Sequence, residues 1–370
     1  MNKYFENFYD WWKNIDKYIL SLIIGMFALG LFFSLVSTSL IASDKLNTNS
    51  YYFFLKHLTF ILLGIIVLLF FSILNQKILI KISIIFFLIT FFCLFLVPFF
   101  GVEVKGSKRW LDPFFLPRFQ PVEILKPFFV IIISILLSLN NKKIYVKYIF
   151  SAGILIPILL LLISQPDIGQ SLLLTMSWLA LIFVSGINIL LFFSFFITAG
   201  IIVSYLVFFI PKFEYIKLRL LTFLDASSGN NYQSEKASDA IINGGFFGKG
   251  IGEGTLNSRV PEAHTDYIVS VISEEFGAII VIAIMLMYLV LSYKIIQKIN
   301  LAKDNNIKLI LIGCTSIILL QSFIHLGVNI RLLPTTGMTL PFLSYGGSSI
   351  ISTALISGII LNLTKRKIIQ

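Results

Sequence analysis

Long apolar runs, separated by short polar connections, occupy most of the chain. A helix crosses the hydrocarbon core of a bilayer with about 20 apolar residues, because it satisfies its backbone hydrogen bonds internally. Ten runs come close to that length, at residues 18–42, 56–74, 79–100, 123–139, 145–164, 169–186, 189–211, 267–293, 308–329 and 346–364. The pattern predicts an all-α polytopic membrane protein with about ten transmembrane helices. The runs at 123–139 and 169–186 are short and begin with polar residues, so each could instead be tilted or half-buried.

Lysine and arginine in the short connections give the spans an orientation. Residues 140–143, 294–308 and 365–367 are rich in these cations and fall on the same side of the predicted spans. Short loops with an excess of positive charge stay in the cytoplasm. We therefore expect both termini there, with a cytoplasmic segment at 1–17 and a single transmembrane domain at 18–367. No small-residue cleavage site follows the first run, so we expect it to remain as an anchor.

The composition agrees with a membrane protein and narrows its partners. The 370 residues are 57% hydrophobic and 13% charged, against roughly 25% charged residues in soluble domains. The net charge of +11 comes from cations that flank apolar runs, which favours anionic head groups and phosphates over nucleic acid. Cys93 and Cys314 both lie inside apolar runs, so their spacing predicts neither a disulfide framework nor a metal cluster.

Two loops on the opposite, extracytoplasmic side are unusually long. The first, residues 101–122, carries four cations: Lys105, Lys108, Arg109 and Arg118. Short outer loops are usually poor in lysine and arginine, so the four cations indicate a function for this loop. Cations beside glycine and serine are suited to binding phosphate oxygens. The second loop, residues 212–266, is too long for a simple connection and is not of low complexity, so we expect it to be ordered and functional.

The second loop ends at Asp266, at the predicted start of the eighth span. A carboxylate there could cap the helix, or it could stand at the membrane boundary as a general base or metal ligand. One helical stripe contains Asp266, Ser270, Ser273 and Gly277, with Glu274 and Glu275 deeper in the run. Acids inside a span usually face a cavity or a partner, so the stripe predicts the wall of a water-filled site. His264, just before it, is expected to assist by hydrogen bonding.

Further charged groups lie at predicted helix starts on the same outer face. Glu123 and Lys126 are three residues apart on the helix that begins at Gln120 and Pro121, so they are neighbours on its surface. They could form a solvated interfacial pair, but Lys126 enters an apolar run, which favours a buried role. Asp167, between two runs, could be a functional acid or a helix cap.

Two glycine-containing segments complete this outer face. The connection at 329–349 contains two prolines and two adjacent glycines, and such irregular backbone is tolerated at membrane depth where it lines a cavity. The glycine-rich stretch at 244–254 follows no strand, which excludes a dinucleotide-binding or P-loop site, although glycines permit tight turns or close approach to a ligand. Five segments thus place their unusual residues on one face, and we predict a single site there.

At these residues the sequence resembles the SEDS family of bacterial shape, elongation, division and sporulation proteins, from about Asp16 to Lys367. The most specific parts of the resemblance are Lys105–Trp110, Gln120–Lys126, Gln165–Asp167, Pro261–Asp266, Glu274–Gly277 and Gly337–Ser349. Within the second outer loop, residues 243–245, 250–254 and 261–266 look more like division-type than elongation-type members. Val122 stands where the family usually has serine, which affects a local helix cap.

The resemblance implies a ten-helix SEDS-type fold and a peptidoglycan glycosyltransferase that polymerises lipid II in the bacterial inner membrane, at the division septum for a division-type member. It also implies glycan linked to undecaprenyl pyrophosphate as the second substrate. The implied protein partners are a class B penicillin-binding protein, which is the transpeptidase, and the other division proteins.

The resemblance also assigns roles to residues. The family's essential aspartate falls on Asp266, and a glutamate and lysine of its fourth helix fall on Glu123 and Lys126, so we expect these three to be catalytic. The expected substrate-binding residues are Lys105, Lys108, Arg109, Gln120, Asp167, His264, Ser344 and Ser348. A divalent cation, magnesium or manganese, is expected on Asp266, and no organic cofactor is expected.

Other functions would use many of the same features. A lipid II flippase also needs spans with intramembrane acids, but no internal repeat is visible and the polar groups gather at one face rather than at mid-membrane. An elongation-type polymerase and a non-catalytic division scaffold also remain open. Polymer formation by the purified protein would separate a polymerase from a flippase or a scaffold.

Overall fold

The computed structural model describes residues 9–38, 51–104, 106–114, 117–139, 143–210, 213–224, 232–256 and 260–366. Eight helices within these ranges are long and apolar enough to cross a membrane. They are α2 (Lys17–Thr38), α4 (Tyr52–Ile73), α5 (Gln76–Phe100), α6 (Pro121–Ser138), α7 (Ile144–Ser164), α9 (Ile189–Phe209), α13 (Ala278–Leu301) and α14 (Asn305–Asn329). Two shorter apolar helices, α8 (Ile168–Val184) and α15 (Gly347–Leu363), account for the remaining predicted runs. The predicted all-α polytopic class is confirmed.

The eighth predicted span, residues 267–293, is wrong in its boundaries. A short helix, α12 (Ile268–Phe276), ends at Gly277, and the membrane-spanning helix α13 begins at Ala278. Gly277 has a φ of 84°, in the left-handed region that interrupts an α-helix and that glycine adopts at little cost. Apolar residues continue across the break, so hydropathy alone could not reveal it.

Both outer loops contain secondary structure of their own. The first loop forms an antiparallel hairpin of β1 (Val102–Val104) and β2 (Ser107–Trp110), which the all-helical prediction did not include. The second loop contains α10 (Glu214–Leu224) and α11 (Tyr232–Gly244) before α12. The part of this loop that the structure describes is therefore ordered, as the sequence predicted.

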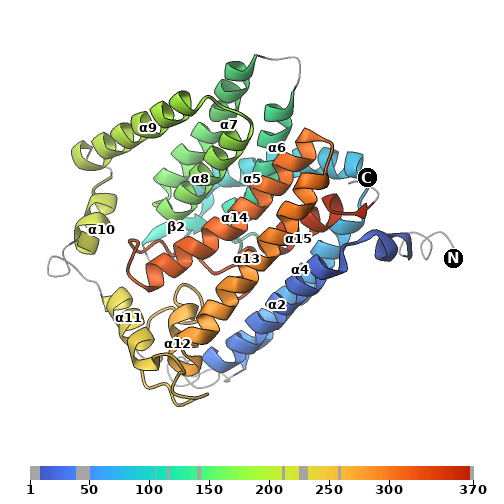
Figure 1. Ribbon diagram of the computed structural model, residues 1–370. Helices are drawn as coiled ribbons and strands as arrows, with labels where there is room; N and C mark the ends of the chain where they lie inside the picture. Colours follow the sequence, from blue (N-terminus) through green and yellow to red (C-terminus); the bar gives the residue numbers. More distant parts are fainter. Residues whose placement is uncertain are drawn as a thin grey trace.

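The most buried helices are α6, α14 and α15, and α9 lies at the edge of the bundle (Figure 1). Small residues allow the close approach of α15 to α4, because a Cβ at Gly64 would lie 3.3 Å from Ala354 and one at Gly358 would lie 2.8 Å from the carbonyl oxygen of Leu68. Glycine at such contacts is typical of packed membrane helices. The outer helices expose leucine, isoleucine and phenylalanine, which is the surface that lipid tails require.

Residues from both ends of the described chain meet at the same end of the bundle. The indole of Trp11 donates to Ser72 over 3.1 Å, and the amide of Asn362 donates to the carbonyl oxygen of Ser72 over 3.2 Å. The hairpin, α10 to α12 and the connection before α15 gather at the opposite end. This arrangement confirms that the unusual segments share one face.

Candidate active site

A buried ion pair lies near the start of α6. Lys126 Nζ is 2.7 Å from Glu123 Oε2, and the two side chains are 1% and 5% exposed. The sequence brings them together because residues three apart are neighbours on a helix, and Pro121 occupies a position in the first turn where its missing N–H costs nothing. The solvated interfacial alternative is therefore wrong, and the buried one is correct.

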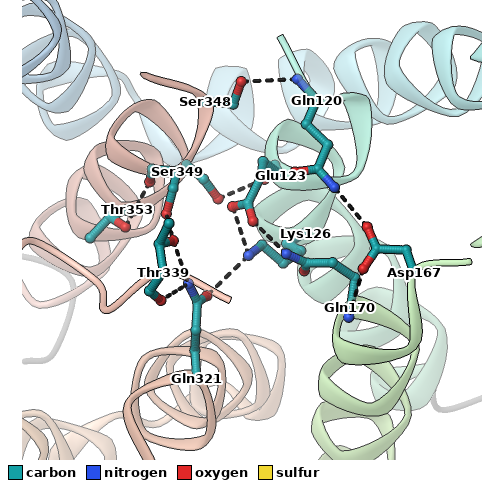
Figure 2. Close-up of polar contacts among 11 residues, drawn as sticks. Gln120, Glu123, Lys126, Asp167, Gln170, Gln321, Thr339, Ser348, Ser349 and Thr353 are labelled. Carbon is teal, nitrogen blue, oxygen red and sulfur yellow. Dashed lines mark hydrogen bonds and ion pairs between the residues drawn. The ribbon is translucent and has the colours of Figure 1, made fainter. Parts of the chain in front are cut away.

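Amide side chains from two other helices complete the pair (Figure 2). Gln170 of α8 donates to Glu123 Oε1 over 2.5 Å, and Lys126 Nζ donates to Gln321 of α14 over 3.0 Å. Ser352 of α15 donates to the backbone oxygen of Glu123 over 2.6 Å. A buried charge is tolerated only when it is paired and hydrogen-bonded, so four helices are held in register around this pair.

Asp167 links this cluster to the outer face. Its Oδ2 accepts from the amide of Gln120 over 2.7 Å, and its Oδ1 accepts from the backbone N–H of Gln170 over 3.4 Å. Asp167 is thus a helix cap, as one of the two interpretations predicted, and it also belongs to the polar cluster. Burial raises the pKa of Asp167, and the positive charges of Arg109 and Lys126 oppose that rise.

Serines at the start of α15 and in the connection before it bind backbone groups. Ser348 accepts from the backbone N–H of Gln120 over 2.9 Å. Ser344 donates to the carbonyl oxygen of Thr265 over 2.7 Å and accepts from the N–H of Leu340 over 2.8 Å. Ser344 therefore positions the segment that leads into Asp266.

Asp266 and Arg109 reach the same small space beside Gly337. A Cβ built at Gly337 would lie 3.5 Å from Asp266 Oδ2 and 4.0 Å from Arg109 Nη1. Arg109 is held there because its Nε donates to the carbonyl oxygen of Gln165 over 3.1 Å and its Nη2 donates to that of Pro166. A carboxylate at this position can accept a proton, and a guanidinium beside it can bind a phosphate oxygen.

The backbone around Asp266 differs from the prediction. Asp266 lies in a turn, and Tyr267 rather than Asp266 is the N-cap of α12. The backbone oxygen of Asp266 accepts from the amide of Asn329 over 3.1 Å. The N-cap position of α12 is therefore one residue later than predicted, and α14 holds the turn in place.

The other candidate binding residues lie in different surroundings. Lys108 is exposed on β2 opposite Glu103, and because side chains alternate along a strand it faces away from Arg109. Lys105 lies outside the described residues. The ring of His264 packs against Phe53 and Tyr345, with centroids 5.0 and 5.8 Å away. Of the three cations of the first outer loop that were expected to bind substrate, the structure brings Arg109 close to Asp266 and turns Lys108 away from Arg109.

The predicted water-filled stripe below Asp266 is wrong. Ser270 and Ser273 are buried, and Ser270 donates to the carbonyl oxygen of Tyr267. The acids below them bind the glycine-rich segment: Glu274 Oε1 accepts from Asn243 and from the N–H of Leu256, and Glu275 Oε2 accepts from the N–H of Gly252. A helical stripe shows which residues share a face but not what covers that face, and here other parts of the second outer loop cover it.

The same contacts explain the glycines at 244–254. A Cβ at Gly244 would collide with the carbonyl oxygen of Ser273, and one at Gly248 with that of Glu275. The glycines permit a close approach of backbone to backbone, and the close approach to a ligand that the sequence also allowed is not needed to explain them.

Sequence reasoning missed several members of the site. They are Gln170, Gln321, Asn329, Gly337, Thr339 and Ser349. Two of them carried a signal, because Gln170 and Gln321 are amides inside apolar runs, where an unpartnered polar group is costly. Asn329, Gly337, Thr339 and Ser349 lie in the connection at 329–349, which the sequence placed at the site, but their individual contacts depend on distant residues and could not be predicted.

The described residues contain no group of three or more His, Cys, Asp or Glu side chains arranged to hold a metal ion. Magnesium commonly uses one or two carboxylates and takes its other ligands from water and substrate phosphates. The buried Oδ1 of Asn329, beside the Asp266 turn, has no hydrogen-bond partner among the described residues. Asp266 therefore fits a divalent cation only as one protein ligand of a phosphate-bound ion.

The fold and the site together define a polytopic membrane protein with a charged site at one end of its bundle. Residues 16–368 match the sequence model of the cell cycle protein family that includes FtsW and RodA. The chain belongs to this family.

Curated relatives and solved structures cover nearly the whole chain. A probable peptidoglycan glycosyltransferase FtsW of Geobacter sulfurreducens is 31% identical in an alignment of 372 positions that covers 96% of this chain and 97% of that one. The corresponding FtsW of Caulobacter vibrioides is 29% identical over 361 residues, covering 96% and 91%. A chain of a peptidoglycan synthase complex that coordinates polymerization and crosslinking is similar with a TM-score of 0.78 and 23% identity, covering 95% and 97%. The rod shape determining protein RodA of Thermus thermophilus matches with a TM-score of 0.69 and 22% identity, covering 96% and 98%.

Proposed function

We propose that the protein is a peptidoglycan glycosyltransferase that polymerises lipid II at the division septum. Family membership and relatives named as FtsW glycosyltransferases support the activity. The structural observation that carries the proposal is the convergence of Asp266 and Arg109 on the space beside Gly337.

The reaction joins two lipid-linked sugars. A sugar hydroxyl of the acceptor attacks the anomeric carbon of the growing chain, a new glycosidic bond forms, and the bond to the pyrophosphate breaks. Undecaprenyl pyrophosphate leaves with the bonding electrons. Asp266 accepts the proton of the attacking hydroxyl, a step worth about 10²–10⁴-fold in rate.

Charge develops on the departing pyrophosphate and must be stabilised. Arg109 is oriented for this by the carbonyl oxygens of Gln165 and Pro166, which leave its Nη1 directed at the site. A magnesium or manganese ion on Asp266 would add Lewis-acid stabilisation of the same phosphates. In that case Asp266 serves as the ligand of the ion.

Glu123 and Lys126 act as positioning residues in this proposal. Both are buried and fully engaged with each other and with Gln170 and Gln321. Their contacts lead through Gln170 to Asp167, which directly follows the two carbonyl groups that hold Arg109. Holding that turn fixes the guanidinium relative to Asp266.

The remaining parts of the proposal concern place and partners. The protein lies in the bacterial inner membrane with both termini in the cytoplasm and its site on the outer face. It works beside a class B penicillin-binding protein and other division proteins, and the likeness to a chain of a peptidoglycan synthase complex supports such a partner.

The direct test is polymerisation of purified lipid II by the full-length protein with its transpeptidase partner. Replacement of Asp266 by Ala should abolish glycan formation, because neither the base nor the cation ligand remains. Asp239→Asn is the matched control, since Asp239 lies on α11 of the same loop and forms an exposed pair with Lys236. Polymer formation by folded Asp266→Ala protein would contradict the proposal, and a wild-type protein that leaves lipid II monomeric would favour a flippase or scaffold.

A further inference from the structure

A second cationic pocket lies beside the site, formed by α10, the start of α11 and the connection after α14, at the left-hand side of Figure 1. Its volume is about 260 Å³. Polar groups from all three segments line it: Arg219, Thr222, Gln233, Ser234, Arg331 and Thr335. The mechanism above uses none of these residues.

Among the residues that the structure describes, the two arginines of this pocket form no ion pair. Neither Arg219 nor Arg331 forms an ion pair with a carboxylate of the described residues, where the paired cations are Arg118, Lys126, Lys236 and Lys298. Arg219 Nη1 donates to the carbonyl oxygen of Thr335 over 3.3 Å. A guanidinium has five N–H donors, and within the described part of the chain this is the one hydrogen bond that Arg219 donates.

The surroundings of Arg219 make its charge costly without a ligand. Burial lowers the pKa of Arg219 and the positive charge of Arg109 lowers it further, which together outweigh the opposing effect of the Asp167 carboxylate. Arg331 has a φ of 57°, a left-handed backbone that non-glycine residues adopt at a cost and that is common at functional positions. The pocket thus combines a partly buried charge at Arg219 with an unfavourable backbone conformation at Arg331. A bound anion would stabilise the charge of Arg219.

We propose that this pocket binds an oxyanion of the lipid-linked substrate, as a second anion subsite next to Arg109. The inference rests on the proposed function for its ligand. Pockets that enclose a whole drug-sized ligand measure about 300–1,000 Å³, so this smaller pocket suits a charged part of the substrate rather than the whole molecule. Arginine forks match the paired oxygens of phosphate and carboxylate, and the substrate offers both, in its pyrophosphate and in its stem peptide.

The test is equilibrium binding to the full-length protein in nanodiscs, without turnover. The probes are undecaprenyl pyrophosphate, which has no peptide, and a lipid II analogue whose acceptor hydroxyl is replaced by hydrogen. The variants are Arg219→Gln and Arg331→Gln, with Arg118→Gln as control, because Arg118 is an exposed arginine of the outer face already paired with Asp112. Arg219→Lys tests the fork, since it keeps the charge but loses the paired donors.

Each Gln variant should weaken binding of the lipid II analogue about tenfold, as expected for a lost hydrogen-bonded charge, while Arg118→Gln leaves it unchanged. Weaker binding of undecaprenyl pyrophosphate as well assigns the pyrophosphate as the ligand. Loss confined to the lipid II analogue assigns the peptide carboxylate. Affinities equal to that of Arg118→Gln for both probes, in variants with a normal unfolding temperature, would overturn the subsite. These binding measurements need no polymerisation, so they test the subsite alone. The proposed activity is tested separately, by polymerisation of lipid II with the wild-type protein.

Discussion

The space between Asp266 and Arg109 stays open because residue 337 is a glycine. Gly337 has a φ of 68°, and any side chain there would point between the carboxylate and the guanidinium. Two effects of a substitution must therefore be separated: the backbone cost of a left-handed residue and the loss of room for substrate. The chain offers a control, because Gly186 also has a positive φ, 91°, with no atom within 4 Å of a built Cβ.

Gly337→Ala should reduce lipid II polymerisation at least tenfold, while Gly186→Ala leaves it near the wild-type rate. Both variants lose roughly 1 kcal/mol of stability from the left-handed backbone. Polymerisation rates and unfolding temperatures measured in the same detergent check this. Equal activities of the two variants would show that the space beside Gly337 is not used.

The pair of Glu123 and Lys126 allows a test of its positioning role. Lys126→Met leaves Glu123 as a buried unpaired charge and should cost about 3–5 kcal/mol. The double variant Glu123→Gln/Lys126→Met should recover most of the unfolding temperature but remain at least tenfold less active, because the turn that holds Arg109 is no longer fixed. Recovery of activity together with stability would instead assign the pair a purely structural role.

An exposed pair provides the matching control for that experiment. Lys236 and Asp239 are also three residues apart on a helix, at 3.1 Å, but are 28% and 49% exposed. Lys236→Met should change stability by about 1 kcal/mol or less, because solvent screens the charges.

At the scale of elements, the site depends on segments that are far apart along the chain and held by a few polar contacts. Opposite the site, α2 is tied to the end of α13 by an ion pair of 2.6 Å between Asp16 and Lys298. Asp16 Oδ1 also accepts from the backbone N–H groups of Tyr18 and Ile19. Burial raises the pKa of Asp16, but the hydrogen bonds from Lys298 and from the backbone outweigh it and lower the pKa overall.

A lowered pKa in the folded protein means that the contribution of Asp16 to stability is complete above its ordinary value of 3.8 and is lost as the pH falls below it. Asp16→Asn should therefore lower the unfolding temperature by a constant amount between roughly pH 5 and 8, because the carboxylate of Asp16 is ionised in the folded and the unfolded protein throughout that range. The difference from wild type should shrink as the pH falls toward 3. Thermal unfolding at several pH values measures it, and a difference that does not depend on pH would contradict the ion pair.

At the scale of the whole molecule, relatives named FtsW and a structural likeness to RodA point to one fold that serves division or elongation. The arrangement of helices does not distinguish these two roles, since both kinds of protein share it. The proposed division role rests on the names of the relatives and on the second outer loop, which resembles that of division-type members.

Depletion of the protein in its own cells should therefore give filaments, because septal glycan is no longer made while elongation continues. Wild-type protein supplied in trans should restore division, and Asp266→Ala protein at equal abundance should not. Round cells on depletion would assign the protein to elongation instead, without affecting the proposed chemistry.

The sequence alone determined the features that depend on neighbouring residues. Runs of about 20 apolar residues predicted the spans, helical spacing predicted the pair of Glu123 and Lys126, and polar residues at the ends of runs predicted a site on one face. These are local properties, and the bilayer makes them unusually informative because it admits few alternatives to a helix.

The tertiary structure decided which distant residues meet. It brought Arg109 and not Lys108 to Asp266, ended a helix at Gly277 within an apolar run, and turned Glu274 and Glu275 toward the glycine-rich segment rather than toward water. It also added Gln170 and Gln321 to the buried pair. Such contacts join residues tens of positions apart, and they are set by the packing of helices and the need to satisfy every buried polar group, neither of which can be deduced from a run of sequence.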